Sequence, residues 1–124
     1  MNRMSAVAVA QPSSYADLLN PVSDTRPCGE DLEYDPAFVL LQTKVVPRAS
    51  VQYGDFVATP DPLNWAEVER DCRGLLLRTR DIRLLILLIR CRCRTAQVQG
   101  LRDGLSMLQV LLAQHPDDIH PQLV

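Results

Sequence analysis

The segment NPVSDTRPCGEDLEYDP, from Asn20 to Pro36, decides how the rest of the chain folds around it. Its prolines hold the residues that precede them in extended conformations, which stops a helix from running through the segment. Gly29 can adopt a positive φ, and Asp35 followed by Pro36 has the pattern of a helix N-cap and first helical residue. The segment therefore predicts a rigid extended loop that ends where a helix begins.

Short helices are predicted on both sides of this loop. Before it, Ser14 and Asp17 have the three-residue spacing of a capping box, and they predict a short helix that stops at Asn20. After it, a second helix runs from Pro36 to about Pro47, where proline cannot continue it. The residues expected to face inward from this second helix are Phe38, Leu41 and Val45.

Two long helices are predicted in the middle of the chain. Asn64 is placed to cap the first and Asp81 to cap the second. Residues at helical spacing along the first helix form one stripe that is expected to face inward. They are Trp65, Val68, Cys72, Leu75, Leu76 and Thr79. The second long helix is apolar on almost every side from Ile82 to Ile89, with Arg83 as the exception. This pattern is typical of a helix in the centre of a bundle.

A third long helix is expected after a break around Thr95 to Gln97. Its predicted inward stripe is Val98, Leu101, Leu105, Leu108, Leu111 and Leu112. Gly100 and Gly104 lie one turn apart beside this stripe and would let a neighbouring helix approach closely. Residues 48–63 are expected to form a loop, because they contain Gly54, Pro60 and Pro62. Strand signals are weak along the chain, since no hairpin turn between alternating runs is recognised. The predicted fold is all-α, a single helical domain of three long and about two short helices with a rigid extended loop.

Composition limits the domain organisation and the compartment. A chain of 124 residues has the length of a single domain. We expect residues 14–124 to form this domain and residues 1–13 to be a mobile arm. No apolar run approaches the roughly 20 residues of a membrane span, so we expect a cytoplasmic protein without membrane insertion. In such a compartment the four cysteines are expected to stay reduced and mostly buried.

Charge is unevenly distributed along the chain. The net charge is −2, yet residues 70–102 carry nine arginines against Asp71 and Asp81. These arginines are interpreted mainly as solvated helix faces or partners of the acidic block before residue 70. Nucleic-acid binding is the alternative, but the acidic balance, the few aromatic residues and the lack of a recognisable DNA- or RNA-binding motif argue against it.

No catalytic, metal or cofactor site is predicted. Cys91 and Cys93 would point to different sides of a helix and lack the second ligand pair of a zinc site. Cys28 is followed by Glu30 and Asp31, and carboxylates do not activate a thiol. The sequence also lacks a phosphate loop or a catalytic triad order, so we expect a non-enzymatic protein.

Several short blocks, in this order, resemble the N-terminal domain of the TssA (ImpA-related) proteins of bacterial type VI secretion systems. The resemblance runs from Leu18 to Leu123, and its most specific block is PCGEDL followed by YDP, from Pro27 to Pro36. Members usually have Gly-Leu where this chain has Gln97 and Val98. The other blocks are Tyr53-Gly54-Asp55, Asn64-Trp65, Arg78-Thr79-Arg80-Asp81-Ile82-Arg83, Gly100-Leu101, Gly104-Leu105 and His120-Pro121-Gln122-Leu123.

The resemblance implies a role in assembling the contractile tail. Family members act in the cytoplasm and contact baseplate, tube and sheath components of the secretion apparatus. In them this domain begins a longer protein whose C-terminal part forms a ring-like homo-oligomer, so the chain is expected to be a fragment of such a protein. Structural self-association, or packing against the rest of the same protein without another partner, is the alternative reading.

We expect the partner contact on the rigid loop and the basic corner that follows the first long helix, because a fixed backbone loses little entropy on docking. The residues predicted to bind the partner are Pro27, Cys28, Gly29, Glu30, Asp31, Tyr34, Arg80 and Arg83. An internal structural role for the two arginines is the competing expectation.

Overall fold

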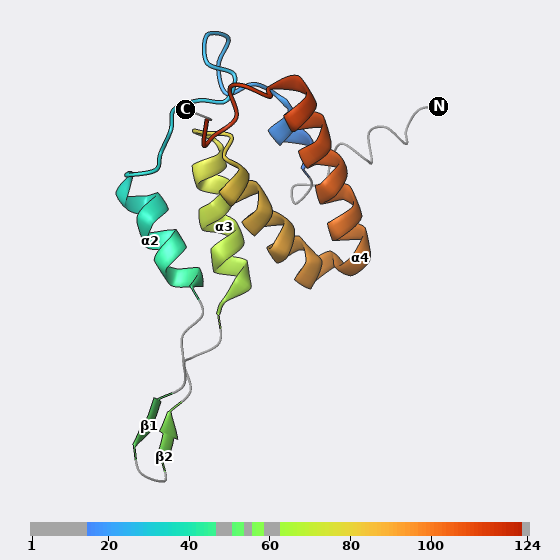
Figure 1. Cartoon of the computed structure of the whole chain (residues 1–124). Helices are drawn as coiled ribbons and strands as arrows, with labels where there is room; N and C mark the ends of the chain where they lie inside the picture. The colour runs from blue at the N-terminus through green and yellow to red at the C-terminus, as the bar shows by residue number, and fades with distance from the viewer. Residues whose placement is uncertain (1–14, 47–50, 54–55, 59–62, 123–124) are drawn as a thin grey trace.

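The computed structural model describes residues 15–46, 51–53, 56–58 and 63–122. The elements, in chain order, are the 3-10 helix η1 (Ala16–Leu19), α2 (Pro36–Val45), β1 (Val51–Tyr53), β2 (Phe56–Ala58), α3 (Trp65–Leu76) and α4 (Ile82–Gln114). Figure 1 shows α2 and α3 side by side, with the first half of α4 running next to α3 and its second half turning back along the side away from α2. The predicted all-α fold with a single helical domain is confirmed.

Side-chain caps begin the three longer helices, as predicted. Asp35 accepts a hydrogen bond from the amide of Ala37 at the start of α2, and Asn64 accepts one from Glu67 at the start of α3. At the start of α4, Asp81 accepts from the amide of Arg83. Each cap satisfies an amide that the first helical turn leaves unpaired. The predicted cap at Ser14 and the arm at residues 1–13 lie outside the described residues.

The core lies between α3 and the first half of α4. The predicted stripe of α3 is buried there, with Trp65 partly buried at its start. From α4, Leu84, Leu85 and Leu88 are fully or almost fully buried, as expected for the central helix. Phe38 and Leu41 cover this core from α2.

The predicted break before the third long helix falls inside α4. At Gln97 the backbone has φ 53° and ψ −133°, and two helical segments meet at this kink. A residue with a Cβ rarely adopts this conformation, whereas glycine does so easily. This is the position at which the family resemblance implied a glycine.

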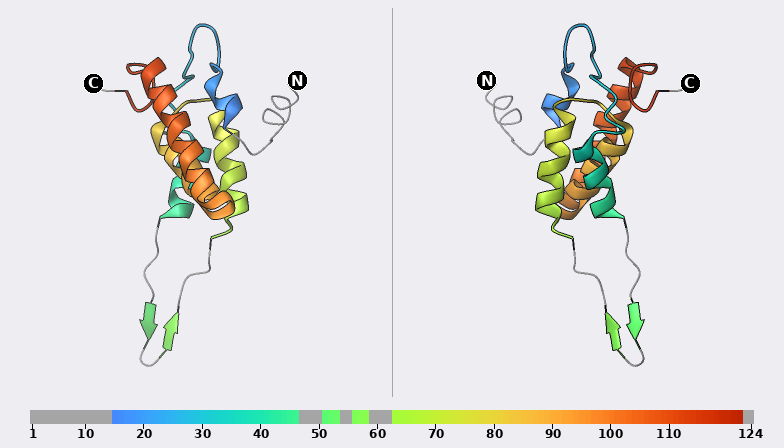
Figure 2. Two further views of the ribbon diagram at one scale, coloured as in Figure 1. Left: turned by 90° about the vertical axis from the view of Figure 1, so that its right-hand side faces the viewer. Right: turned by 90° about the vertical axis from the view of Figure 1, so that its left-hand side faces the viewer.

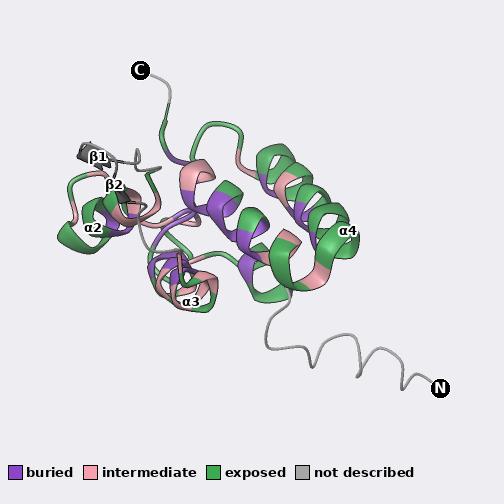
Figure 3. Cartoon of the chain, turned by 90° about the horizontal axis from the view of Figure 1, so that it is seen from below, coloured by how far each residue is buried: buried purple, intermediate pink, exposed green. Residues whose placement is uncertain are grey.

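The stripe predicted for the third long helix is largely wrong. Val98 is 77% exposed, and Leu101, Leu105 and Leu112 are also exposed. The buried face instead carries Gly100, Gly104, Met107 and Leu111, so only Leu111 was placed correctly, while Leu108 is partly buried. The exposed outer surface is visible along the second half of α4 in Figure 3.

The two glycines explain why this face turns inward. A Cβ on Gly104 would lie 2.6 Å from Cγ1 of Ile89 and 3.0 Å from the hydroxyl of Tyr15, and a Cβ on Gly100 would overlap the carbonyl of Arg92. The second half of α4 therefore packs closely against its own first half and against the start of η1. The close approach predicted for Gly100 and Gly104 is confirmed.

The loop predicted for residues 48–63 contains a short hairpin. β1 and β2 pair antiparallel, with Val51 opposite Ala58 and Tyr53 opposite Phe56. Figures 1 and 2 show the hairpin extending away from the helices. The pair Gly54-Asp55 between these runs is a hairpin signal that the sequence prediction missed, because runs of three residues give only a weak alternating pattern.

Replacing Gln97 with glycine is expected to stabilise the protein. The strained backbone costs about 1–3 kcal/mol and glycine removes most of that cost, against about 0.5–1 kcal/mol of extra chain entropy. We expect the Gln97→Gly midpoint of thermal unfolding to rise by a few degrees.

A second glutamine provides the matched control. Gln109 lies exposed in a regular part of α4, so Gln109→Gly is expected to lower the midpoint. A fall with both variants would show that the backbone at Gln97 is not strained.

Candidate protein-docking site

The extended segment of residues 20–35, between η1 and α2, is called the signature loop, and it is bonded to the corner between α3 and α4. The amide of Arg80 donates to the carbonyl of Cys28 at 2.7 Å, and the hydroxyl of Thr79 donates to the same carbonyl at 3.4 Å. Gly29 and Thr79 form an isolated antiparallel bridge. The loop thus pairs with the corner as a short strand would, although about 50 residues separate them in the chain.

Gly29 allows this pairing through its conformation and its size. Its φ is +70°, and a Cβ there would overlap the backbone carbonyl of Arg78. Glycine alone meets both requirements. The positive φ predicted from the sequence is therefore confirmed, together with its cause.

His120 adds a third segment to the same corner. Its amide donates to the carbonyl of Arg80 at 3.0 Å, and its carbonyl accepts from the amide of Ile82 at 2.8 Å. Its ring Nε2 lies 2.9 Å from the carbonyl oxygen of Gly29, which can only accept, so this nitrogen carries the hydrogen. We call the contacts of Cys28, Gly29, Thr79, Arg80 and His120 the corner junction.

The side chain of Arg80 lies inside this junction and is only 5% exposed. Its Nε donates to the carbonyl of Leu18 at 2.9 Å and its Nη2 to that of Asn20 at 2.8 Å, while Nη1 bonds the carbonyl of Leu76. Burial lowers the pKa of this guanidinium from its usual value. The structure therefore gives Arg80 an internal role, which was the competing expectation from the sequence.

Arg83 connects the loop to the start of α4 through contacts with Glu33 and Asp81. It bonds both carboxylate oxygens of Asp81, at 3.0 and 2.8 Å, and its Nη1 lies 3.7 Å from Glu33. Its guanidinium also lies 4.9 Å from the centre of the Phe38 ring. The hydrogen bonds with Asp81 raise the pKa of Arg83. Although about a third of the side chain is exposed, its charge is already paired.

The predicted partner-binding residues therefore divide into two groups. Cys28 is buried, where burial raises the pKa of its thiol, and Pro27 and Gly29 are partly buried. Of the predicted residues in the loop, Glu30, Asp31 and Tyr34 are exposed to solvent, and Tyr34 is 86% exposed. We call these three residues the loop face.

Local contacts hold the loop face in place. Asp31 accepts a hydrogen bond from the amide of Glu33 at 3.0 Å. Next to Tyr34, Asp35 accepts from Nη2 of Arg78 at 2.7 Å, and this hydrogen bond lowers the pKa of the carboxyl group. The exposed tyrosine is thus carried by a backbone that Arg78 ties to the corner between α3 and α4.

A cleft of about 330 Å³ between α2 and α3 lies beside these contacts. Arg78, which bonds Asp35, forms part of its wall, and Leu40 and Leu75 supply apolar surface. A Cβ on Gly74 would meet no atom within 4 Å, so the cleft is open over this glycine. Sequence reasoning missed it, because a gap between two helices leaves no pattern in either of them.

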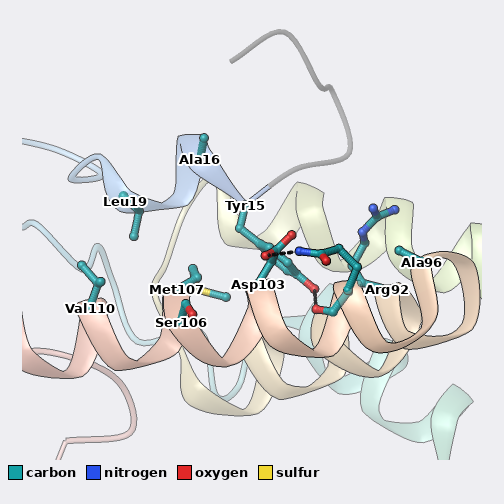
Figure 4. A pocket seen from close by; sticks show the side chains of 11 residues that line it. Tyr15, Ala16, Leu19, Arg92, Ala96, Asp103, Ser106, Met107 and Val110 are labelled. Atoms are coloured by element: carbon teal, nitrogen blue, oxygen red, sulfur yellow. Dashed lines mark hydrogen bonds between the residues drawn. The ribbon is translucent and has the colours of Figure 1, made fainter. Parts of the chain in front are cut away.

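A second cleft, of about 390 Å³, lies between η1 and α4 (Figure 4). Tyr15 donates from its hydroxyl to the carbonyl of Gly100 at 3.0 Å, and Met107, Leu19 and Val110 supply the apolar wall. None of the predicted site residues lines this cleft. Of the residues that line it, Gly100 was identified in the sequence only as a sign of close helix packing.

Many of the arginines between residues 70 and 102 have partners within the described part of the chain. Arg73 pairs with Glu69 at 3.0 Å, and Arg90 and Arg94 lie over the ring of Trp65. Together with Arg78, Arg80 and Arg83, these side chains are divided among several separate contacts. Three of these contacts, Arg73 with Glu69, Arg78 with Asp35 and Arg83 with Glu33, agree with the interpretation of the arginines as partners of the acidic block before residue 70.

Within the described ranges, the cysteines and acidic residues show no arrangement for metal binding. Cys72 donates from its thiol to the carbonyl of Leu84 at 3.1 Å, and Cys91 is buried. Among the described residues, no three histidine, cysteine or acidic side chains lie close enough together to hold an ion. In the same part of the chain, no helix is both long and apolar enough to cross a membrane.

Removing the guanidinium of Arg80 is expected to destabilise the fold strongly. In Arg80→Met the carbonyls of Leu18, Asn20 and Leu76 lose their donor, at a cost of about 1–3 kcal/mol for each that stays buried. We expect the midpoint of thermal unfolding to fall by more than 10 °C, measured by circular dichroism. Arg102→Met, at an exposed position, provides the control and is expected to leave the midpoint nearly unchanged. A small effect at Arg80 would contradict its internal role.

Comparison with known proteins identifies the family. The family model described as "ImpA, N-terminal, type VI secretion system" matches residues 19–124. The type VI secretion system component TssA1 of Pseudomonas aeruginosa is 37% identical over 106 residues, which cover 86% of this chain and 31% of that protein. This chain therefore spans about a third of the length of that relative.

A solved structure has the same fold. It is the N-terminal domain, including the conserved ImpA_N region, of the TssA component of the type VI secretion system from Burkholderia cenocepacia. The match has a TM-score of 0.72 at 26% identity and covers 92% of this chain and 41% of that one. With the family model matching most of the chain, including the signature loop and the corner junction, this chain belongs to the ImpA-related N-terminal domains of type VI secretion system TssA proteins.

Proposed function

We propose that this domain is a non-enzymatic docking module that binds a baseplate, tube or sheath protein during assembly of the type VI secretion apparatus, on its cytoplasmic side. The family membership supplies the context of the secretion machinery. The observation that supports docking at this place is the loop face, in which an almost fully exposed tyrosine stands on a backbone fixed at both ends.

Tyr34 has the properties of a binding anchor. Tyrosine contributes a large contact area with few rotatable bonds, and such residues are often the energetic centre of an interface. Because the corner junction and the bond between Asp35 and Arg78 already order the loop, little entropy is lost when a partner covers it. The cleft between α2 and α3 adds apolar surface close to this anchor.

The charges of the loop face indicate the chemistry of the partner. Glu30 is mostly exposed, and its nearest cation, Arg26, lies 3.8 Å away on an exposed side chain. Such a surface contact contributes little, so the carboxylate of Glu30 is available to a partner. The complementary surface would carry a pocket for a tyrosine ring with lysine or arginine beside it. If the complete protein forms a ring, as the family resemblance implies, several copies would present the loop face together and strengthen a modest affinity.

Truncating Tyr34 is expected to weaken partner binding without unfolding the domain. Tyr34→Ala should reduce the affinity for the baseplate, tube or sheath protein that binds the unmodified chain by at least about tenfold, as is usual for an interface anchor. Binding of the immobilised chain to each purified component, followed by biolayer interferometry, measures this. Glu30→Lys should also weaken binding and reduce its dependence on salt.

Leu77→Ala is the matched control, because Leu77 is a large exposed apolar residue outside the loop face. Binding that survives both loop variants would refute the loop face as the docking surface. Failure of the unmodified chain to bind any of the three classes of component would refute the proposed function itself.

A further inference from the structure

One side of the second half of α4 presents apolar side chains to solvent in a regular pattern. Its members are Val98, Leu101, Leu105, Leu108 and Leu112, which we call the outer stripe. They follow the alternating spacing of three and four residues that is typical of a helix that packs against another helix. Four of them are exposed, Leu105 to 53%, and Leu108 is partly buried. Single exposed leucines need no explanation, but a continuous stripe indicates a contact surface.

The helix cannot bury this stripe by turning about its axis. Its inner face is fixed by the close contacts of Gly100 and Gly104 described above, and by the buried side chains of Met107 and Leu111. A rotation that brought the leucines inward would drive their side chains into space that is open only to glycine. Another surface must therefore cover the outer stripe if it is to leave water.

We propose that a second copy of this chain covers it, so that two α4 helices pair antiparallel about a two-fold axis near Leu105. The outer stripe has the symmetry that such a pairing needs, because Val98 and Leu112 lie at equal distances, seven residues, on either side of Leu105. Val98 of one copy then faces Leu112 of the other, and the two Leu105 side chains meet close to the axis. A two-fold pairing requires a surface that is complementary to itself, and an uncharged apolar stripe fulfils this condition.

The charges next to the stripe are compatible with this pairing. Arg102, at one edge, would lie opposite Gln109 of the second copy, whose amide oxygen can accept a hydrogen bond. Asp103 points to another side of the helix and accepts a hydrogen bond from Gln99 at 2.8 Å. The antiparallel arrangement therefore brings no two like charges together across the axis. A parallel pairing would place the Arg102 side chains of the two copies next to each other.

The size of the stripe indicates a reversible dimer. From Val98 to Leu112 a helix spans roughly 21 Å, and one such face buries less than the about 800 Å² per partner of a typical stable interface. Association in the micromolar range is expected. This pairing goes beyond the proposed docking function and uses none of the residues of the loop face.

Sedimentation velocity of the purified chain over a wide range of concentration tests the pairing. The unmodified chain should convert from monomer to dimer as its concentration rises. Leu105→Glu should weaken association by at least about tenfold, because two carboxylates would meet near the axis. Leu105→Lys should do the same for the same reason. Far-UV circular dichroism checks that both variants remain folded, which we expect because the changed side chain is exposed.

Mixing the two variants provides the decisive measurement. Equal amounts of Leu105→Glu and Leu105→Lys should form a heterodimer, because opposite charges then meet near the axis, and only a pairing of Leu105 with its own copy predicts this rescue. Leu77→Glu, a similar change at an exposed leucine directly after α3, should dimerise like the unmodified chain.

Three results would overturn the proposal: a monomer at every concentration, a dimer that survives Leu105→Glu, or no rescue on mixing. A monomer at every concentration would assign the outer stripe to a different protein or to another part of a longer chain. Because the docking experiment is read out through Tyr34 and Glu30, either proposal can fail while the other stands.

Discussion

The fold depends on the close contact between Gly29 and the carbonyl of Arg78. With a positive φ and no Cβ, Gly29 lets the signature loop lie directly against the backbone of the corner between α3 and α4. The hydrogen bonds of the corner junction follow from this approach, because the carbonyl of Cys28 is then within reach of the amide of Arg80. His120 pairs with the same corner from the end of the chain. Segments that the sequence separates by about 90 residues are thus held in one small volume.

The junction also separates structural residues from those available for binding. Arg80 and Cys28 turn inward, and the paired charge of Arg83 braces the loop, while Tyr34, Glu30 and Asp31 remain outside. A buried arginine that donates to carbonyl oxygens costs desolvation energy, and it is retained where its several donors order the backbone. The rigidity of the loop and the exposure of Tyr34 therefore have a common physical origin.

Local signals predicted much of this structure from the sequence. Asp35, Asn64 and Asp81 were identified as caps because capping chemistry acts within a few residues, and Gly29 was expected to have a positive φ because it lies in a segment that cannot be helical. Whether Arg80 reached outward or inward could not be predicted. Both roles use the same residue type, and its partners at Leu18 and Asn20 lie about 60 residues earlier.

The second half of α4 shows where hydrophobic periodicity misleads. Two faces of this helix were candidates for burial, and the leucine-rich one was chosen because burial of large apolar side chains is the commoner pattern. The helix instead buries the face with Gly100 and Gly104, since contact with Ile89 and Tyr15 requires residues without a side chain. The leucines left outside give the domain an apolar surface that a sequence pattern alone would assign to its core.

Amide hydrogen exchange, resolved by residue with NMR, tests the central role of the corner junction most directly. The amides of Arg80, Ile82 and His120 lie outside regular helical hydrogen bonding, and each donates across the junction. If the junction holds the fold together, these three amides exchange as slowly as the buried amides of α3 and the first half of α4, near the limit set by global unfolding. Exchange at the rate of exposed loop amides, with the helices still protected, would contradict this account.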